Sequence, residues 1–588
     1  MSTASRDEAS ASPDDTPDLS AFEPLRAAEQ LVLRAWRDDD IARVGLRRPI
    51  VPSSDITVRG AFVAQLARGS ADGRLAPRSV QIVGAWIEGR MDLRDAHVGE
   101  SLWFYRCVFN ATPRLDGARV SGSVSFPGCL LPGLRAEDAV IGGVLALNSG
   151  CVVRTEVRLA RALIGHDLNC ERLQLRSAED SDTPIRRRIS AEGARIDGNA
   201  LLTGGLESDG DLRLVGLRVG GDLRATRARL SGEIDDEGFR GDALNLDLAR
   251  VAGSVYLDQG FSASGLVRLR QARIQGDLDC SGAAFDALGD MAWRGATTVA
   301  LDQARIGGTL VLAQQSMPLQ GVSLAAAEAQ ALADDDTTWG EDLTLDGFRY
   351  RRFARTAPTQ ADFRVDWLKR QQTAHLGRDF RPQPWQQAIE ALRGGSQEHA
   401  ARDVAIARER HLRQVGRVGM GLPRPLRALA RAGHLLVDGL MGFGHKPLRL
   451  VAALALLWLA CGLVYWAAAE NGAIAPLNPA VYNDPRLAAC RTGDAAGASW
   501  THCPQLPPEH PAFRPFAYSL DVLLPFANLQ QRQTWTSLDS HGADASRAAA
   551  SQAWGVASRW LAWYQGLFGW LAIALLGWWA LRRSTRGG

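Results

Sequence analysis

Small residues recur about every eleven positions in the first third of the chain. They are Ala85, Ala96, Cys107, Ala118, Cys129, Ala139, Cys151, Ala162 and Leu173. Most of them open a phrase of the form A-x-[I/V]-x-G-x-[L/V]-x-[L/F], as at 96–104. Within the phrase, apolar residues alternate with polar ones, which is typical of a strand with one buried face. The central glycine interrupts the alternation and predicts a bend between two short strands.

Two such phrases make about 22 residues, which suits one coil of a solenoid whose coils stack at about 4.8 Å. Apolar residues at helical spacing are missing from this stretch. The pattern therefore predicts a mainly β fold, a right-handed β-helix solenoid of about 22 residues per coil over 80–353. Helical caps are expected at both ends, followed by two transmembrane helices.

A longer recurrence of 55 residues relates Ala162, Leu217 and Ala272, and likewise Ala194, Ala249 and Ala304. The additional residues of each period are rich in charge, and insertions at equal spacing emerge on one face, which is often a binding face. A solvated fringe without a partner is the simpler alternative. The candidate binding residues in these insertions are Arg186, Arg187, Asp235, Asp236, Arg240, Asp290, Arg294 and Trp339.

The composition changes along the chain and divides it into nine segments. We expect a disordered acidic tail, an N-terminal helical cap, the repeat domain, a C-terminal helical cap and an amphipathic juxtamembrane segment. A transmembrane helix, an extracytoplasmic loop, a second transmembrane helix and a short cytoplasmic tail follow. The bounds are 1–19, 20–79, 80–353, 354–415, 416–449, 450–469, 470–559, 560–581 and 582–588.

Two apolar segments, 450–469 and 560–581, are each long enough to span roughly 30 Å of hydrocarbon. Arginines and one lysine precede the first segment, and Arg582, Arg583 and Arg586 follow the second. Because positive residues concentrate on the cytoplasmic side, both termini are expected in the cytoplasm. The sequence thus predicts a multi-pass protein of a bacterial inner membrane with the lipid bilayer as a partner.

The 588 residues carry a formal charge of only +2, so no global field favours nucleic acid, and none is expected as a partner. Cys490 and Cys503 fall in the predicted external loop, where a disulfide is plausible and two unpaired thiols are the alternative. The remaining cysteines are spread over the repeat and the first apolar segment. Cys107, Cys129 and Cys151 stand 22 apart and fill positions that alanine fills elsewhere, so we interpret them as core residues.

Motifs that would indicate catalysis are missing. The sequence contains no H-E-x-x-H, no phosphate-binding loop and no nucleophile elbow, and close cysteine pairs are absent as well. We therefore expect no catalytic residues, no cofactor and no metal. In the external loop, Asp521 and Asn528 form the one polar cluster worth testing for ion passage. An interfacial helix that packs on the two spans is the neutral alternative.

Several stretches resemble a bacterial group of membrane-anchored, pentapeptide-repeat-like proteins. They are VQIVGAWIEGRMDL at 80–93, AARDVAIARER at 400–410, GFGHKP at 442–447 and YSLDVLLPF at 518–526. The resemblance covers most of the chain after residue 55 and implies a membrane-bound β-rich protein. Some members carry an oxidoreductase label, for which no cofactor motif is present in this sequence.

Three functions follow as hypotheses. The favoured one is a membrane-anchored scaffold or binding platform for an unknown protein partner, without evident catalysis. The second is a small channel or membrane sensor that forms a homo-oligomer and is built from the two spans and the loop helix. The third is an oxidoreductase, which rests on the resemblance alone.

Overall fold

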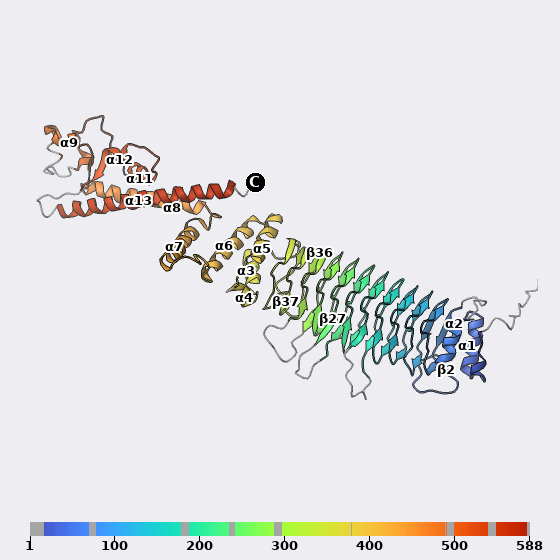
Figure 1. Cartoon of the computed structure of the whole chain (residues 1–588). Coiled ribbons are helices and arrows are strands. Elements are labelled where there is room, and N and C mark those ends of the chain that lie inside the picture. Colours follow the sequence, from blue (N-terminus) through green and yellow to red (C-terminus); the bar gives the residue numbers. More distant parts are fainter. Residues whose placement is uncertain are drawn as a thin grey trace, which may run out of the picture. The chain divides into compact units, whose positions relative to one another are not determined.

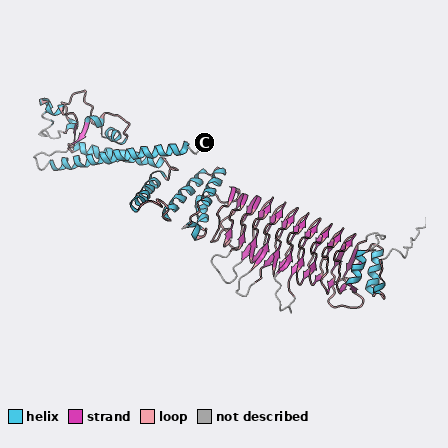
Figure 2. Ribbon diagram, viewed as in Figure 1, coloured by secondary structure: helices cyan, strands magenta, loops and turns pink. Residues whose placement is uncertain are grey.

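The computed structural model describes residues 17–69, 78–177, 187–233, 241–286, 297–377, 379–487, 490, 499–538 and 548–584. The chain divides into two compact units, Met1–Arg408 and Glu409–Gly588. The first unit holds most of the strands, and the second unit is mainly helical (Figures 1 and 2).

Within the described residues, the strands of the first unit form three parallel sheets of 21, 10 and 8 strands. The largest sheet runs to β39 (Arg349–Phe353) in two columns that merge in β36 (Arg305–Val311). The ten-stranded sheet extends from β2 (Thr57–Arg59) to β34 (Ala284–Asp286). The eight-stranded sheet extends from β11 (Leu134–Arg135) to β37 (Val322–Ser323).

The predicted fold class is wrong. The chain is an α/β protein with about 32% helix and 23% strand, and its strands belong to large parallel sheets rather than to a mainly β solenoid. Two physical facts explain the error. Most strands are only two residues long, so the repeating phrases contribute little strand. The long helices outside the phrases contribute much more.

Alternation nevertheless decides what each strand buries. In β6 (Leu102–Tyr105), Leu102 and Phe104 are fully buried, whereas Trp103 and Tyr105 are half-buried. The predicted strands with one buried face are confirmed here. Cys107, Cys129 and Cys151 are also fully buried, and the Cys107 N–H donates to Cys129 Sγ at 3.3 Å. They contribute to the core between the sheets.

Helices lie at both ends of the strand region in the first unit (Figure 2). At the N-terminal end they are α1 (Ala27–Arg37) and α2 (Gly60–Arg68), after a short 3-10 turn at Ser20–Phe22. At the other end, α3 (Ala361–Lys369), α4 (Thr373–Leu376) and α5 (Gln383–Gly394) follow β39, and α5 packs on that strand. They cover core residues that a terminal strand would otherwise expose.

The second unit begins within α6 (Glu398–Gln414) and continues with α7 (Arg424–Met441). Two helices, α8 (Leu448–Glu470) and residues Ser551–Leu581 of α13 (Ala548–Ser584), are long and apolar enough to cross a membrane. Between them lie the antiparallel strands β40 (Ile474–Pro476) and β41 (Trp535–Ser537). The same region contains α9 (Ala480–Asn483), α11 (Pro515–Leu523), α12 (Gln531–Thr534) and the 3-10 turns at Pro485–Leu487 and Trp500–His502.

Candidate functional site: a row of arginines

Five consecutive strands in one column of the largest sheet each begin with an arginine. Strand pairing places these arginines directly beside one another. Because neighbouring strands lie about 4.8 Å apart, the row is roughly 19 Å long. The strands are β20 (Arg195–Ile196), β24 (Arg218–Val219), β28 (Arg250–Val251), β32 (Arg273–Ile274) and β36.

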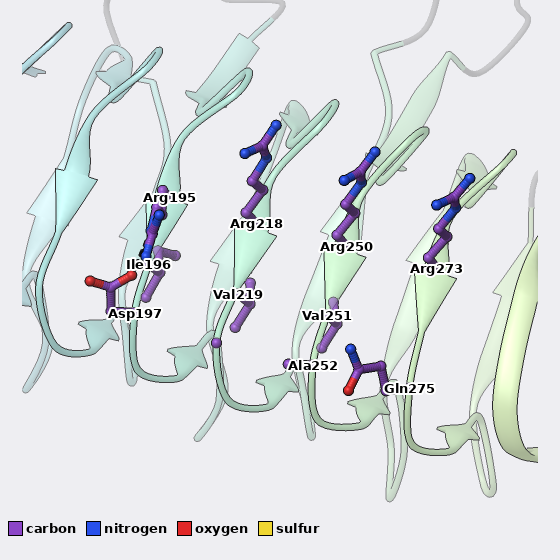
Figure 3. Close-up of a pocket in the computed structure, with 11 residues that line it drawn as sticks. Arg195, Ile196, Asp197, Arg218, Val219, Arg250, Val251, Ala252, Arg273 and Gln275 are labelled. Carbon is purple, nitrogen blue, oxygen red and sulfur yellow. Dashed lines mark hydrogen bonds and ion pairs between the residues drawn. The ribbon is translucent and has the colours of Figure 1, made fainter.

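The local sequence forces each arginine outward. The residue that follows it is isoleucine or valine, and this residue is buried in all five strands. Since successive side chains of a strand point to opposite faces, burying the apolar residue exposes the arginine. We call Arg195, Arg218, Arg250, Arg273 and Arg305 the arginine row. Figure 3 shows four of them side by side, one per strand.

A shallow groove follows the arginine row. Its first part has a volume of about 370 Å³ and extends from Arg195 to Arg273. Small residues, Gly220 and Ala252, stand beside the arginines there and leave the guanidinium groups accessible. A second part of about 870 Å³ shares Arg273 and Gln275 and continues to α5.

The two ends of the row have carboxylate neighbours. Arg195 Nε lies 2.6 Å from Asp197 Oδ1, and Arg305 Nε lies 3.9 Å from Glu328 Oε2. The guanidinium groups of Arg218, Arg250 and Arg273 have no hydrogen-bond or ion-pair partner among the residues that the structure describes. Three neighbouring cations thus stand together without a counter-charge.

Arginines on the eight-stranded sheet show the opposite arrangement. Arg158, Arg213 and Arg268 are separated in register by the uncharged Ser190 and Asn245. Each of these arginines also has a carboxylate partner: Glu156 at 2.7 Å, Glu192 at 2.9 Å and Asp242 at 3.2 Å, respectively. The protein therefore neutralises stacked arginines on that sheet and leaves the arginine row uncompensated.

Like charges directly opposite each other destabilise a sheet. For two unit charges about 5 Å apart in water, the repulsion is about 0.8 kcal/mol. An anionic ligand that contacts several guanidinium groups removes this repulsion, and guanidinium matches phosphate and carboxylate geometry with paired hydrogen bonds. The arginine row is therefore an anion-binding surface with a linear repeat.

The predicted binding loops lie mostly beyond what can be described. Arg187 is exposed at the start of β19 (Arg187–Ser190) and pairs in register with Asp211 of β23 (Asp211–Arg213). Trp339 is buried, and its Nε1 donates to Asp334 Oδ2 at 2.7 Å, so it packs in the core rather than facing a partner. Six further residues fall outside the described residues: Arg186, Asp235, Asp236, Arg240, Asp290 and Arg294.

In the second unit, Cys490 and Cys503 form a disulfide bond. Asp521 is buried in α11, where its two carboxylate oxygens accept hydrogen bonds from the backbone N–H groups of Leu529 and Arg532 at 3.1 and 2.8 Å. Asn528 is exposed and accepts from the Gln530 N–H at 3.2 Å. The structure thus gives both side chains a role in holding the turn between α11 and α12.

No group of three or more histidine, cysteine, aspartate or glutamate side chains is placed to hold a metal ion in the described parts of the chain. The thiols of the first unit are inaccessible, and burial raises the pKa of Cys170 to about 12.

The arginine row was missed in the sequence, although a signal for it is present. Each row arginine directly follows one of the residues that carry the 55-residue recurrence or the intervening step: Ala194, Leu217, Ala249, Ala272 and Ala304. The recurrence was used to locate the insertions, and the position next to it was not compared between periods.

No protein-family model, no curated protein and no solved structure matches this chain. The resemblance to membrane-anchored, pentapeptide-repeat-like proteins stays a prediction from the sequence.

Proposed function

We propose that this protein is a membrane-anchored binding platform whose arginine row holds an elongated polyanion with repeated phosphate groups. The observation that supports the proposal is the uncompensated charge of Arg218, Arg250 and Arg273 at in-register positions of neighbouring strands. A repeating ligand matches a repeating surface, because one chain then contacts several guanidinium groups at once.

The lining of the groove favours recognition by charge alone. Between Arg195 and Gln275, the described lining residues include no aromatic side chain. Single-stranded nucleic acids are usually held by bases stacked on aromatic rings as well as by basic grooves. Inorganic polyphosphate therefore fits this surface better than a nucleic acid does.

The membrane part of the proposal rests on α8 and α13, which are apolar enough to cross a bilayer. Lys446 and Arg449 lie at the start of α8, and Arg582 and Arg583 lie near the end of α13. By the positive-inside rule these ends face the cytoplasm, so the first unit and both termini are cytoplasmic in a bacterial inner membrane. Residues 471–547 are then extracytoplasmic, where the Cys490–Cys503 disulfide is stable.

The proposal is tested with the full chain in nanodiscs and fluorescent inorganic polyphosphate. The triple variant Arg218→Gln, Arg250→Gln, Arg273→Gln is compared with a control that removes the same charge elsewhere: Arg161→Gln, Arg176→Gln, Arg229→Gln. We expect the row variant to lose at least tenfold in affinity, and the salt dependence of binding to fall by about two in the logarithmic slope. The control variant should retain most of the affinity.

Two further probes decide the class of ligand. Oligo(dT) of matched charge tests nucleic acid, and polyglutamate tests acidic polypeptide. Equal losses in the two triple variants, or no binding of any probe, contradict the proposal. Tighter binding of oligo(dT) or polyglutamate than of polyphosphate keeps the site but overturns the phosphate polymer as its ligand.

A channel formed by the second unit has no specific support in the structure. Asp521, the side chain singled out for ion passage, has both carboxylate oxygens engaged with backbone N–H groups.

A further inference from the structure

Helix α7 has two chemically distinct faces. Leu422, just before the helix, and Leu426, Leu429 and Leu436 fall on one side by helical spacing and are 42–68% exposed. The opposite side carries Arg424, Arg427, Arg431, His434 and Asp438. An apolar stripe opposite an arginine-rich face is typical of helices that lie in a membrane surface.

The polar face of α7 is fixed by ion pairs within the second unit. Asp438 is largely buried and accepts hydrogen bonds from Arg410 and Arg413 of α6, with ion-pair distances of 3.0 and 3.1 Å. His434 Nε2 lies 3.6 Å from Glu409 Oε2 on the same side. Burial works to raise the pKa of Asp438, but Arg410 and Arg413 hold it below its usual range, so the carboxylate is charged at neutral pH. These contacts turn the leucines away from α6.

The chain also places α7 next to the end of the apolar helices. It ends at Met441, and α8 begins only seven residues later at Leu448. Met441 packs with Leu450 of α8 and Ala572 of α13 in one buried cluster. Trp579 Nε1 of α13 donates to the Gly444 carbonyl oxygen at 2.9 Å, which ties the connecting turn to the same end of α13. A bilayer crossed by α8 and α13 would have its surface at this level.

We propose that α7 lies in the surface of the membrane, with its leucine face among the upper acyl chains and Arg424 and Arg431 contacting anionic headgroups. The inference rests on the proposed membrane anchoring of α8 and α13. The bilayer is the occupant that the arginine charge and the continuity with α8 favour. Four exposed leucines in water would otherwise form an unusual apolar stripe.

Spin labels at single introduced cysteines test this placement in the full chain, because the native free cysteines in the described residues are buried and Cys490 and Cys503 are paired. The variants are Leu429→Cys on the leucine face, Arg431→Cys on the polar face and Leu456→Cys on the exposed side of α8. They are measured in nanodiscs with and without anionic phosphatidylglycerol, using oxygen and a water-soluble nickel complex as relaxing agents.

We expect the label at 429 to be accessible to oxygen and protected from nickel, at a depth of roughly 5–10 Å, and the label at 431 to be accessible to nickel. The label at 429 should move deeper when phosphatidylglycerol is present. Nickel access at 429 overturns the inference, and so does protection from both agents, which would indicate a protein contact such as a second copy. Nickel access at 456 would instead contradict the membrane anchoring itself, so the two failures are distinguishable.

Discussion

At the scale of single residues, a fully buried ion pair joins the last strands of the first unit to α3. Arg364 donates from Nη1 and Nη2 to the two carboxylate oxygens of Asp334, at 2.6 and 2.8 Å. Neither side chain has any exposed surface. Trp339 Nε1 donates to the same carboxylate, and the Arg364 guanidinium lies 3.7 Å from the centre of the Phe353 ring. Every oxygen of Asp334 is therefore engaged.

Replacing Asp334 with asparagine should destabilise the first unit by about 3–5 kcal/mol, because it leaves the Arg364 charge buried without a counter-ion. Denaturant unfolding followed by tryptophan fluorescence measures the effect, since Trp339 and Trp367 lie 5.5 Å apart beside the pair. Asp197→Asn, at an exposed ion pair, should cost under about 1 kcal/mol. Equal effects of the two substitutions would contradict the assignment.

Asp211 predicts a pH dependence. Burial raises its pKa to about 6, with Arg187 opposing and Asp242 adding to the shift, and Oδ1 has no hydrogen-bond partner among the described residues. The folded pKa exceeds the unfolded value of about 3.9, so the neutral form is favoured on folding. This stabilisation is complete below about pH 4 and is lost as the pH rises through about 6.

Asp211→Asn should therefore raise the midpoint of thermal unfolding at pH 7.5 and leave it unchanged at pH 4. A series of melts between these pH values measures the difference between the variant and the unchanged chain. A midpoint that falls at pH 7.5 would show that the carboxylate is needed in its charged form.

Trp339 shows what residue patterns leave open. Its sequence context, three aspartates and then a tryptophan, resembles the charged insertions, and so it was predicted in an exposed loop. In the structure, it packs against Trp367 from α3 and donates to buried Asp334. Because its partner Arg364 is 25 residues further along the chain than Trp339, no local pattern reveals the burial.

At the scale of elements, α13 packs closely on α11 and α8. A Cβ added at Gly569 would lie 1.9 Å from the Leu523 carbonyl oxygen at the end of α11. Gln565 of α13 donates from Nε2 to Ser519 Oγ at 2.8 Å and accepts from the Tyr465 hydroxyl at 3.0 Å. The three helices are thus joined by a close backbone approach and by a buried polar network, both common between membrane helices.

Gly569→Ala should destabilise the second unit by about 1–3 kcal/mol, because α11 and α13 must move apart to accommodate the methyl group. Gly577→Ala is the matched control in the same helix, since a Cβ there meets nothing within 4 Å. The control should be neutral or slightly stabilising, as alanine favours helix over glycine. Titration with SDS, followed by circular dichroism, measures both. An equal response of the two variants would show that the close approach does not hold these helices together.

At the scale of the whole molecule, the proposed topology makes an accessibility prediction. Cysteines introduced at Arg355 and Glu509, both exposed, lie in the first unit and in the segment between α8 and α13. A membrane-impermeant maleimide should label Glu509→Cys in intact spheroplasts and Arg355→Cys only after permeabilisation. The reverse pattern would invert the topology, and labelling of both in intact spheroplasts would exclude it.

The fold class also belongs to this scale. The phrases predicted short strands correctly where β6 buries Leu102 and Phe104, but the step from phrases to a mainly β solenoid was wrong. The class depends on how much of the chain is helical outside the phrases and on how the strands associate into sheets. Neither property is contained in an eleven-residue pattern.

The sequence by itself determined what depends on neighbouring residues: which strand positions are buried and which two segments are apolar enough to cross a membrane. Hydropathy and alternation are local, so they can be obtained without knowing any partner. The tertiary structure alone decided that Arg195, Arg218, Arg250, Arg273 and Arg305 stand side by side, and which of them lack a carboxylate. Those facts depend on backbone pairing between strands 23 or 32 residues apart, as between Arg195 and Arg218 and between Arg218 and Arg250. Backbone hydrogen bonds fix that register, and the side chains of one strand do not encode it.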